Sequence, residues 1–246
     1  CNMPDQDINK WSLHSIQHKD LLDSILRKKK QIKLPKFKEQ KMPEGELIYT
    51  ANKDHQVYID YLNKRGLKHN DYPFMVNPKA EGRQAIGIVI PYTYENKVVG
   101  STIRFMDDRN PKFINDQQQG YVFGTDLQKE EWEVVLVFEG IFDAISLNGL
   151  ALTHDTINDN QVAVINNLGK RVIVIPDQDK TGLGICERAL ELGYDVALPN
   201  WSEDVKDAND AVIKYGRLNT LLSILDSATN SKIKVEVMRN KIAKRI

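Results

Sequence analysis

The sequence predicts an α/β fold in which a mixed α+β segment precedes a parallel sheet with flanking helices. Two patterns carry this prediction. From about Glu133 onward, unbroken apolar runs alternate with segments of helical periodicity, which is typical of strands buried on both faces of a parallel sheet. Ahead of that region, two β-rich runs at 86–94 and 98–105 flank the three residues Glu95–Lys97, a spacing that indicates a β-hairpin.

The segment ahead of the parallel sheet is predicted to hold two helices as well as the hairpin. Apolar residues at helical spacing precede the basic run Arg27–Lys30, namely Leu21, Leu22, Ile25 and Leu26. A second helical pattern at 57–62 stops at Gly66, a residue type common just after a helix. Within the hairpin, strand alternation places Thr102 and Arg104 on one face.

The region from 133 onward is predicted to alternate between strands and helices. Strands are predicted at 134–138, 171–175 and 195–198, and helices at 141–149, 158–168, 182–192 and 208–215. Gly182 and Gly184 are predicted only to begin one of these helices, which closes at Gly193. The last thirty residues indicate a further helix followed by a basic tail.

Composition excludes several classes of protein. Of the 246 residues, 41% are hydrophobic and 28% charged, which is not the composition of a disordered chain. No apolar run approaches the roughly 18 residues of a membrane span, so no membrane association is expected. The opening residues lack a secretion signal, and the absence of an initial Met suggests a fragment or a processed form. Two cysteines are too few for a disulfide framework, so we expect a cytoplasmic protein, in a host cytoplasm if viral.

The formal net charge of zero conceals three differently charged regions. Residues 1–42 carry 10 basic and 5 acidic side chains, residues 43–216 carry 17 and 27, and residues 217–246 carry 7 and 2. We therefore predict a basic arm at 1–42, an α+β subdomain at 43–132, a sheet domain at 133–216 and a basic helical tail at 217–246. The basic run in the arm is explained equally well by a solvated helix end and by contact with nucleic-acid phosphate.

Acidic side chains follow each predicted strand of the parallel sheet. Glu139 follows the first strand, Asp177 and Asp179 follow the second, and Asp207 follows the third across a loop. Asp143 and Asp210 each lie within one helical turn of such a position. Ligands of open α/β sheets bind beyond the carboxyl ends of the strands, although any one of these acids alone is explained as a helix cap.

A cluster of four or five carboxylates needs protons or cations to offset its repulsion, which is roughly 4 kcal/mol for a close pair. The donor set is oxygen-only, which selects Mg²⁺ or Mn²⁺ over zinc. No zinc site is expected within the chain, since Cys1 has no cysteine nearby and His14 and His18 are expected to be surface residues. No P-loop sequence is present.

Three of these motifs resemble the TOPRIM domain. Glu139–Asp143 is similar to its first acidic motif, Asp177–Asp179 to its Asp-x-Asp motif, and Lys206–Asp210 to the third motif of phage and primase–helicase relatives. Segments further upstream resemble the catalytic core of DnaG-type primases, namely Tyr61–Leu67, Ile90–Phe105, Pro111–Asn115 and Phe123–Gly124. The resemblance covers roughly residues 50–215 and implies a Rossmann-like TOPRIM sheet.

The resemblance implies a DNA primase, which synthesises short RNA primers from NTPs on single-stranded DNA during replication, by Mg²⁺-dependent nucleotidyl transfer. Such primases usually work with a replicative helicase. The catalytic residues would be Glu139, Asp177 and Asp179, and the metal ligands these three with Asp207, supported by Asp143 and Asp210. Arg104, Lys112 and Asn115 would face template and nucleotides.

Three departures from the family pattern and two rival functions accompany this interpretation. The stretch Ala151–His154 only partly resembles the Gly-Thr loop that follows the first TOPRIM helix. Gln119 stands where the family usually has a lysine before Gly120, and the region after 216 is shorter than in bacterial primases. Cys1 is hypothesised to be the last ligand of a zinc ribbon that precedes it. The alternative functions are a TOPRIM nuclease that hydrolyses phosphodiesters with the same acids, and a non-catalytic module that binds or loads on DNA.

Overall fold

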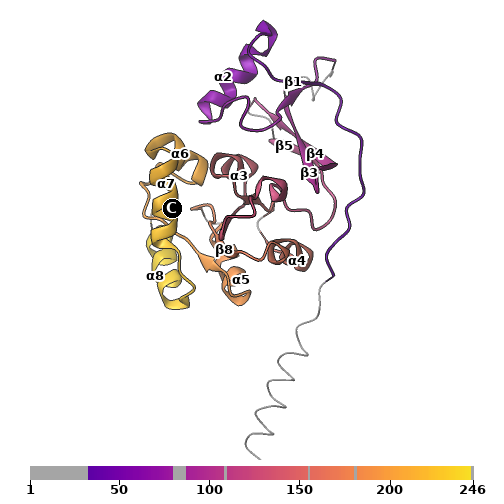
Figure 1. Cartoon of the computed structure of the whole chain (residues 1–246). Helices are drawn as coiled ribbons and strands as arrows, with labels where there is room; N and C mark the ends of the chain where they lie inside the picture. Colours follow the sequence, from indigo (N-terminus) through magenta and orange to yellow (C-terminus); the bar gives the residue numbers. More distant parts are fainter. Residues whose placement is uncertain (1–32, 80–86, 108–109, 155, 180–181, 245–246) are drawn as a thin grey trace, which may run out of the picture. The chain divides into compact units, whose positions relative to one another are not determined.

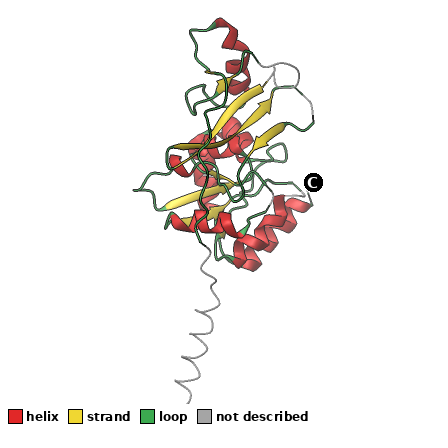
Figure 2. Ribbon diagram, turned by 90° about the vertical axis from the view of Figure 1, so that its right-hand side faces the viewer, coloured by secondary structure: helices red, strands yellow, loops and turns green. Residues whose placement is uncertain are grey.

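Two β-sheets, one antiparallel and one parallel, organise the residues that the computed structural model describes (Figures 1 and 2). These residues are 33–79, 87–107, 110–154, 156–179 and 182–244. The predicted N-terminal helix, the basic run Arg27–Lys30, and Cys1, His14 and His18 lie outside the described residues. The predicted domain boundaries remain predictions.

The antiparallel sheet has five strands in chain order: β1 (Glu46–Leu47), β2 (Met75–Val76), β3 (Gly87–Tyr94), β4 (Lys97–Phe105) and β5 (Phe113–Asp116). The predicted hairpin is present as β3 and β4. Its loop is one residue shorter than predicted, because Lys97 already pairs with Tyr94. The two loop residues, Glu95 and Asn96, have φ of 52° and 61°, the left-handed pair that matches the twist of adjacent strands.

A short helical segment lies between β1 and β2. The 3₁₀ turn η1 (Lys53–His55) begins at Asn52, whose side chain accepts a hydrogen bond from the backbone N–H of Asp54. It runs directly into α2 (Gln56–Lys64), which confirms the helix predicted at 57–62. The chain leaves the helix at Gly66 with φ of 66°, as the C-cap prediction requires.

The parallel sheet has the strand order β7-β6-β8-β9. Its strands are β6 (Val134–Phe138), β7 (Leu150–Ala151), β8 (Arg171–Val174) and β9 (Asp195–Val196). The predicted alternation is confirmed, and α3 (Ile141–Leu147), α4 (Asp159–Asn167), η4 (Gly182–Gly184), α5 (Ile185–Glu191) and α6 (Ala208–Tyr215) lie in the predicted places. Two details were wrong: β7 was not predicted, and β9 ends two residues earlier than expected. Both strands pair over only two residues and therefore leave little periodic signal.

Alternate residues of the central strand β6 point into two hydrophobic clusters. Leu136 and Phe138 pack with residues of α3, α6 and α7 (Arg217–Ser227), and the same cluster includes the buried side of β3. Val135 and Val137 pack with residues of α4, α5 and α8 (Lys232–Ala243). Helices therefore cover both faces of the parallel sheet, as Figure 2 shows, and the strand ends stay free to carry polar groups.

The C-terminal segment contains two helices where one helix and a basic tail were expected. Residues predicted as tail form α8, whose Val235 and Ile242 are buried in the cluster that includes α5. Thr229, just before it, bridges to Val196 of β9. Cys186 of α5 is buried beside them, as predicted for a small core residue. None of the helices in the described ranges is both long and apolar enough to cross a membrane.

Candidate active site

The carboxyl ends of two adjacent parallel strands bring the first two acidic motifs together. Val137 of β6 pairs with Val174 of β8, so Glu139 and Asp177 emerge side by side just past the sheet. The backbone N–H of Asp177 donates a hydrogen bond to Oε1 of Glu139 over 3.1 Å. The strand-end positions predicted from the sequence are thus neighbours in the fold.

The aspartates of the site are held by backbone N–H donors. Asp207 caps α6, and its Oδ1 accepts from the N–H of Asp210 at 2.7 Å. Oδ1 of Asp179 accepts from the N–H of Gly182 at 2.8 Å. Helix capping therefore does apply to Asp207.

Burial and mutual repulsion perturb these carboxyl groups. Burial, and then the negative charges of its neighbours, raise the pKa of Asp177 well above its usual range; the neighbours are Asp143, Glu139, Asp207 and Asp179. Burial and the charge of Asp207 likewise raise the pKa of Asp143, which is 6% exposed. Burial also raises the pKa of Asp207. Four of the other five predicted acids thus act on the carboxyl group of Asp177, and the fifth, Asp210, acts on Asp143 and Asp207.

The donor set suits a hard divalent cation, because every side chain in it offers oxygen and the cluster concentrates unfavourable negative charge. Within the described ranges, however, no three Asp, Glu, His or Cys side chains converge as a metal-binding group. The acids therefore gather without forming a closed coordination sphere. Their chemistry fits Mg²⁺ or Mn²⁺, and their buried, repelling charges are what such an ion would neutralise.

Two glycines allow the backbone to approach these acids closely. A Cβ at Gly182 would lie 2.3 Å from the carbonyl oxygen of Asp177 and 2.6 Å from Oε1 of Glu139. A Cβ at Gly140 would lie 2.3 Å from Oδ2 of Asp143. From the sequence, Gly182 was predicted only as a helix start, because spacing along the chain does not show that η4 lies beside the residue that follows β6.

The antiparallel sheet presents the predicted template-facing residues. Nε of Arg104 donates to the hydroxyl of Tyr61 over 2.9 Å, and its guanidinium lies 4.6 Å from the ring centre of Phe113. Oδ1 of Asn115 accepts from the hydroxyl of Tyr92 over 3.1 Å.

The burial of these predicted contacts differs. Arg104 is 7% exposed, whereas Asn115 and Lys112, which precedes β5, are exposed. The prediction that Thr102 and Arg104 share a face holds, and both side chains are buried. Two of the three predicted contacts are therefore accessible to a ligand, and the third lies close to the interior.

Two further residues of the site were not predicted. The guanidinium of Arg65, just after α2, lies 5.8 Å from the ring centre of Phe142, and its positive charge lowers the pKa of Asp207 against the raising effect of burial. Nδ2 of Asn209 donates to the carbonyl of Arg65 and to Oγ of Ser146, both over 2.7 Å. Both residues lie inside the family-like segments Tyr61–Leu67 and Lys206–Asp210, but their roles depend on which helices meet.

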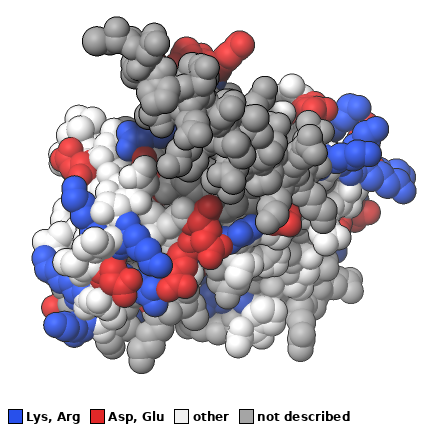
Figure 3. Space-filling model, turned by 90° about the horizontal axis from the view of Figure 1, so that it is seen from below, with Lys and Arg blue, Asp and Glu red and all other residues white. Residues whose placement is uncertain are grey.

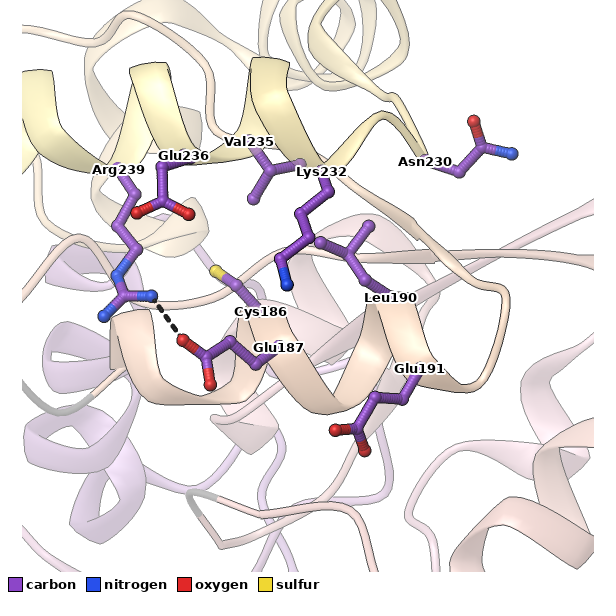
Figure 4. A pocket seen from close by; sticks show the side chains of 9 residues that line it. All are labelled: Cys186, Glu187, Leu190, Glu191, Asn230, Lys232, Val235, Glu236 and Arg239. Carbon is purple, nitrogen blue, oxygen red and sulfur yellow. Dashed lines mark hydrogen bonds and ion pairs between the residues drawn. The ribbon is translucent and has the colours of Figure 1, made fainter.

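Cavities adjoin the site and also lie elsewhere. One of about 200 Å³ is lined by Asp179 and Lys206, next to the acids. Another, of about 290 Å³, lies between α5 and α8 and is drawn in Figure 4. The thiol of Cys186 points into it, and the Arg239–Glu187 ion pair crosses one end over 3.0 Å. On the face seen in Figure 3, acidic and basic side chains of the described residues lie next to one another.

Structural comparison relates this arrangement to primase cores. A DnaG primase catalytic domain bound to single-stranded DNA matches with a TM-score of 0.59 and 17% identity, over 77% of each chain. The RNA polymerase domain of Mycobacterium tuberculosis DnaG matches with a TM-score of 0.58 and 16% identity, over 79% of this chain and 87% of that one. The primase fragment of the bacteriophage T7 primase–helicase protein gives 0.52 and 17%, over 78% and 81%.

Sequence comparison points the same way. A DNA primase of Clostridium acetobutylicum is 24% identical over 168 residues, which are 58% of this chain and 28% of that protein. The chain therefore spans less than a third of the length of that relative. No family model matches the chain. The predicted likeness to the catalytic core of DnaG-type primases is confirmed at the level of structure, and the chain has the fold of that core.

Proposed function

We propose that this chain is the catalytic core of a DNA primase, which joins NTPs into short RNA primers on single-stranded DNA during replication. One observation carries the proposal: within the fold of a primase core, the acids at the ends of β6 and β8 and at the start of α6 gather into one repelling, partly buried cluster. Such a cluster costs stability, so its presence indicates a functional requirement for charge at this place.

We assign the parallel sheet to the TOPRIM family and its acids to the metal. Glu139, Asp177, Asp179 and Asp207 would hold Mg²⁺ or Mn²⁺, with Asp143 and Asp210 supporting them. A bound divalent ion would neutralise the triphosphate and favour attack of a 3′-hydroxyl with pyrophosphate as the leaving group. The backbone N–H groups of Asp177, Gly182 and Asp210 orient the carboxylates beforehand, which lowers the reorganisation needed on binding.

The antiparallel sheet would bind template and nucleotide. Lys112 and Asn115 are exposed and suit phosphate and base edges, and Arg104 offers the remaining N–H groups of a guanidinium fixed by Tyr61 and Phe113. Arg65 is a further cation beside Asp207. That a related DnaG catalytic domain binds single-stranded DNA supports this assignment. A primase of this kind would act in the cytoplasm with a replicative helicase.

A TOPRIM nuclease is the main alternative, because hydrolysis of a phosphodiester would use the same carboxylates. A nuclease does not need the Lys112–Asn115 surface to hold a template for synthesis, and the structural neighbours are primases. A non-catalytic loading module is disfavoured by the acids, since a module without chemistry has no use for a destabilising cluster.

Substitution of Asp177 by Asn tests the proposal. The variant keeps the shape of the side chain and cannot ionise, so we expect it to fold with at least wild-type thermal stability and to make no primers. Asp226→Asn is the matched control: it makes the same substitution at an exposed position of α7 and should leave synthesis unchanged. Primer synthesis by Asp177→Asn at the wild-type rate would refute the assignment of the acids.

A further inference from the structure

Asn209 connects three helical elements around the acidic cluster. Its side chain is 1% exposed, and Nδ2 donates to the carbonyl of Arg65 after α2 and to Oγ of Ser146 in α3. Its own backbone N–H donates to Oδ1 of Asp143, also in α3, over 2.7 Å. Because a carbonyl oxygen can only accept, the contact with Arg65 fixes which end of the amide points to α2.

Asn209 also lies between the acids that α6 contributes. Asp207 caps the helix and Asp210 lies in its first turn, so any shift of that turn moves both carboxylates. The acids of α3 and α6 repel one another, as the effect of Asp207 on Asp143 shows. A buried tie between the two helices opposes the separation that this repulsion favours.

The hydrogen bond from Asn209 to Arg65 also connects α6 to the antiparallel sheet, through α2. The guanidinium of Arg65 lies 5.9 Å from the ring centre of Tyr61, and the hydroxyl of Tyr61 accepts from Arg104 of β4. At Gly66, a Cβ would lie 2.9 Å from Cγ1 of Ile213, so α2 and α6 approach closely. Hydrogen bonds and ring contacts therefore form a continuous path from the face of β4 to the carboxylates.

A general role in core packing does not explain Asn209. Its Oδ1 has no hydrogen-bond partner among the described residues, although it is buried. A buried acceptor without a partner is destabilising. The presence of an amide here despite that cost indicates that its Nδ2 donor group is required.

We propose that Asn209 is a positioning residue. Its Nδ2 fixes the first turn of α6, which carries Asp207 and Asp210, relative to Asp143 of α3 and to the end of α2 that contacts β4 through Tyr61. This inference rests on the proposed function and adds to it a device that keeps the acids aligned with the surface for template and nucleotide. It acts through the carboxylates and need not touch substrate.

The test compares Asn209→Ala with Gln161→Ala. Gln161 of α4 is the matched control, because it is also a fully buried amide. Its Nε2 likewise donates to two acceptors, the carbonyls of Tyr121 and Leu152. Mn²⁺ affinity is measured by calorimetry, single-stranded DNA affinity by fluorescence anisotropy, and kcat and KM by primer synthesis. We expect Asn209→Ala to weaken Mn²⁺ binding and to lower kcat, each by roughly tenfold or more, with DNA affinity unchanged. Gln161→Ala should lose stability but keep wild-type metal affinity and kcat.

Wild-type metal affinity and kcat in Asn209→Ala, or equal losses in both variants, would overturn the inference. If Asn209→Ala does not fold, Ser146→Ala decides, since it removes one of the two acceptors from a helix that tolerates alanine. It should weaken Mn²⁺ binding by about threefold, and unchanged binding would overturn the inference. Mn²⁺ affinity is measured without synthesis, so a wild-type chain that binds Mn²⁺ but makes no primers refutes the proposed function separately.

Discussion

Substituting Gly182 by Ala should disable the acidic site, because the loop after β8 leaves no room for a side chain. The new Cβ would lie 2.3 Å from the carbonyl oxygen of Asp177 and 2.6 Å from Oε1 of Glu139. Cβ contacts under 3.0 Å are essentially never seen, so these groups must separate by at least about 0.7 Å and 0.4 Å. A backbone carbonyl cannot rotate away as the end of a flexible side chain can, so the displacement falls on Asp177 itself.

The matched control is Gly184→Ala, two residues further along. No atom lies within 4 Å of a Cβ there, and φ is −67°, which alanine adopts freely. We expect Gly184→Ala to stabilise the chain by about 0.4–1 kcal/mol and to leave synthesis unchanged. Gly182→Ala should cost about 1–3 kcal/mol of unfolding free energy and lower primer synthesis by roughly a hundredfold. Urea denaturation and incorporation of labelled NTPs measure the two effects, and full activity of a folded Gly182→Ala variant would show that the loop accepts a side chain there.

The charged side chains of the site should respond to pH, to substitution and to salt. Burial and repulsion raise the pKa of Asp143 and Asp177 in the folded chain, so the stability they contribute is complete below the unfolded value and is lost as pH rises through the folded values. The melting temperature without metal should therefore fall from about pH 4 to about pH 9, more steeply than in Asp177→Asn. Added Mn²⁺ should raise the melting temperature most at the alkaline end, and a pH-independent difference between the variants would contradict this. Arg104→Lys keeps the positive charge but loses the planar guanidinium that lies over the ring of Phe113. It should weaken single-stranded DNA binding by about threefold in a titration, and unchanged affinity would argue against a contact between Arg104 and DNA. Lys112→Gln should reduce the slope of log affinity against log salt by about 0.7, and an unchanged slope would place Lys112 away from phosphate.

The fold was largely predictable because its central strands are buried on both faces. The apolar runs that form β6 and β8 are short and continuous, which predicts buried strands. Asp207 and Asp210 mark the cap and the first turn of α6. The two-residue strands β7 and β9 and the docking of α8 depend on contacts with distant residues, which periodicity does not report.

The acidic residues of the site were predictable from the sequence, but the residues that position them were not. Carboxylates at strand ends can be found from the strands alone, because parallel strands bring their carboxyl ends to one edge. The need for Gly182 and the tie made by Asn209 arise where separate elements approach within contact distance. In the sequence, Asn209 lies inside the Lys206–Asp210 motif and Gly182 lies at the start of a predicted helix, and neither position shows what the residue contacts.

If the gathered acids serve template-directed synthesis, the products of a single incubation reveal it. The chain is incubated with single-stranded DNA of known sequence, all four NTPs and Mn²⁺, and the products are identified by mass spectrometry. The proposed function predicts short oligoribonucleotides complementary to the template, with a 5′-triphosphate, and their absence with Asp177→Asn. Shortened DNA strands without RNA would contradict it and indicate a nuclease, and unchanged DNA and NTPs would indicate a module without catalytic activity.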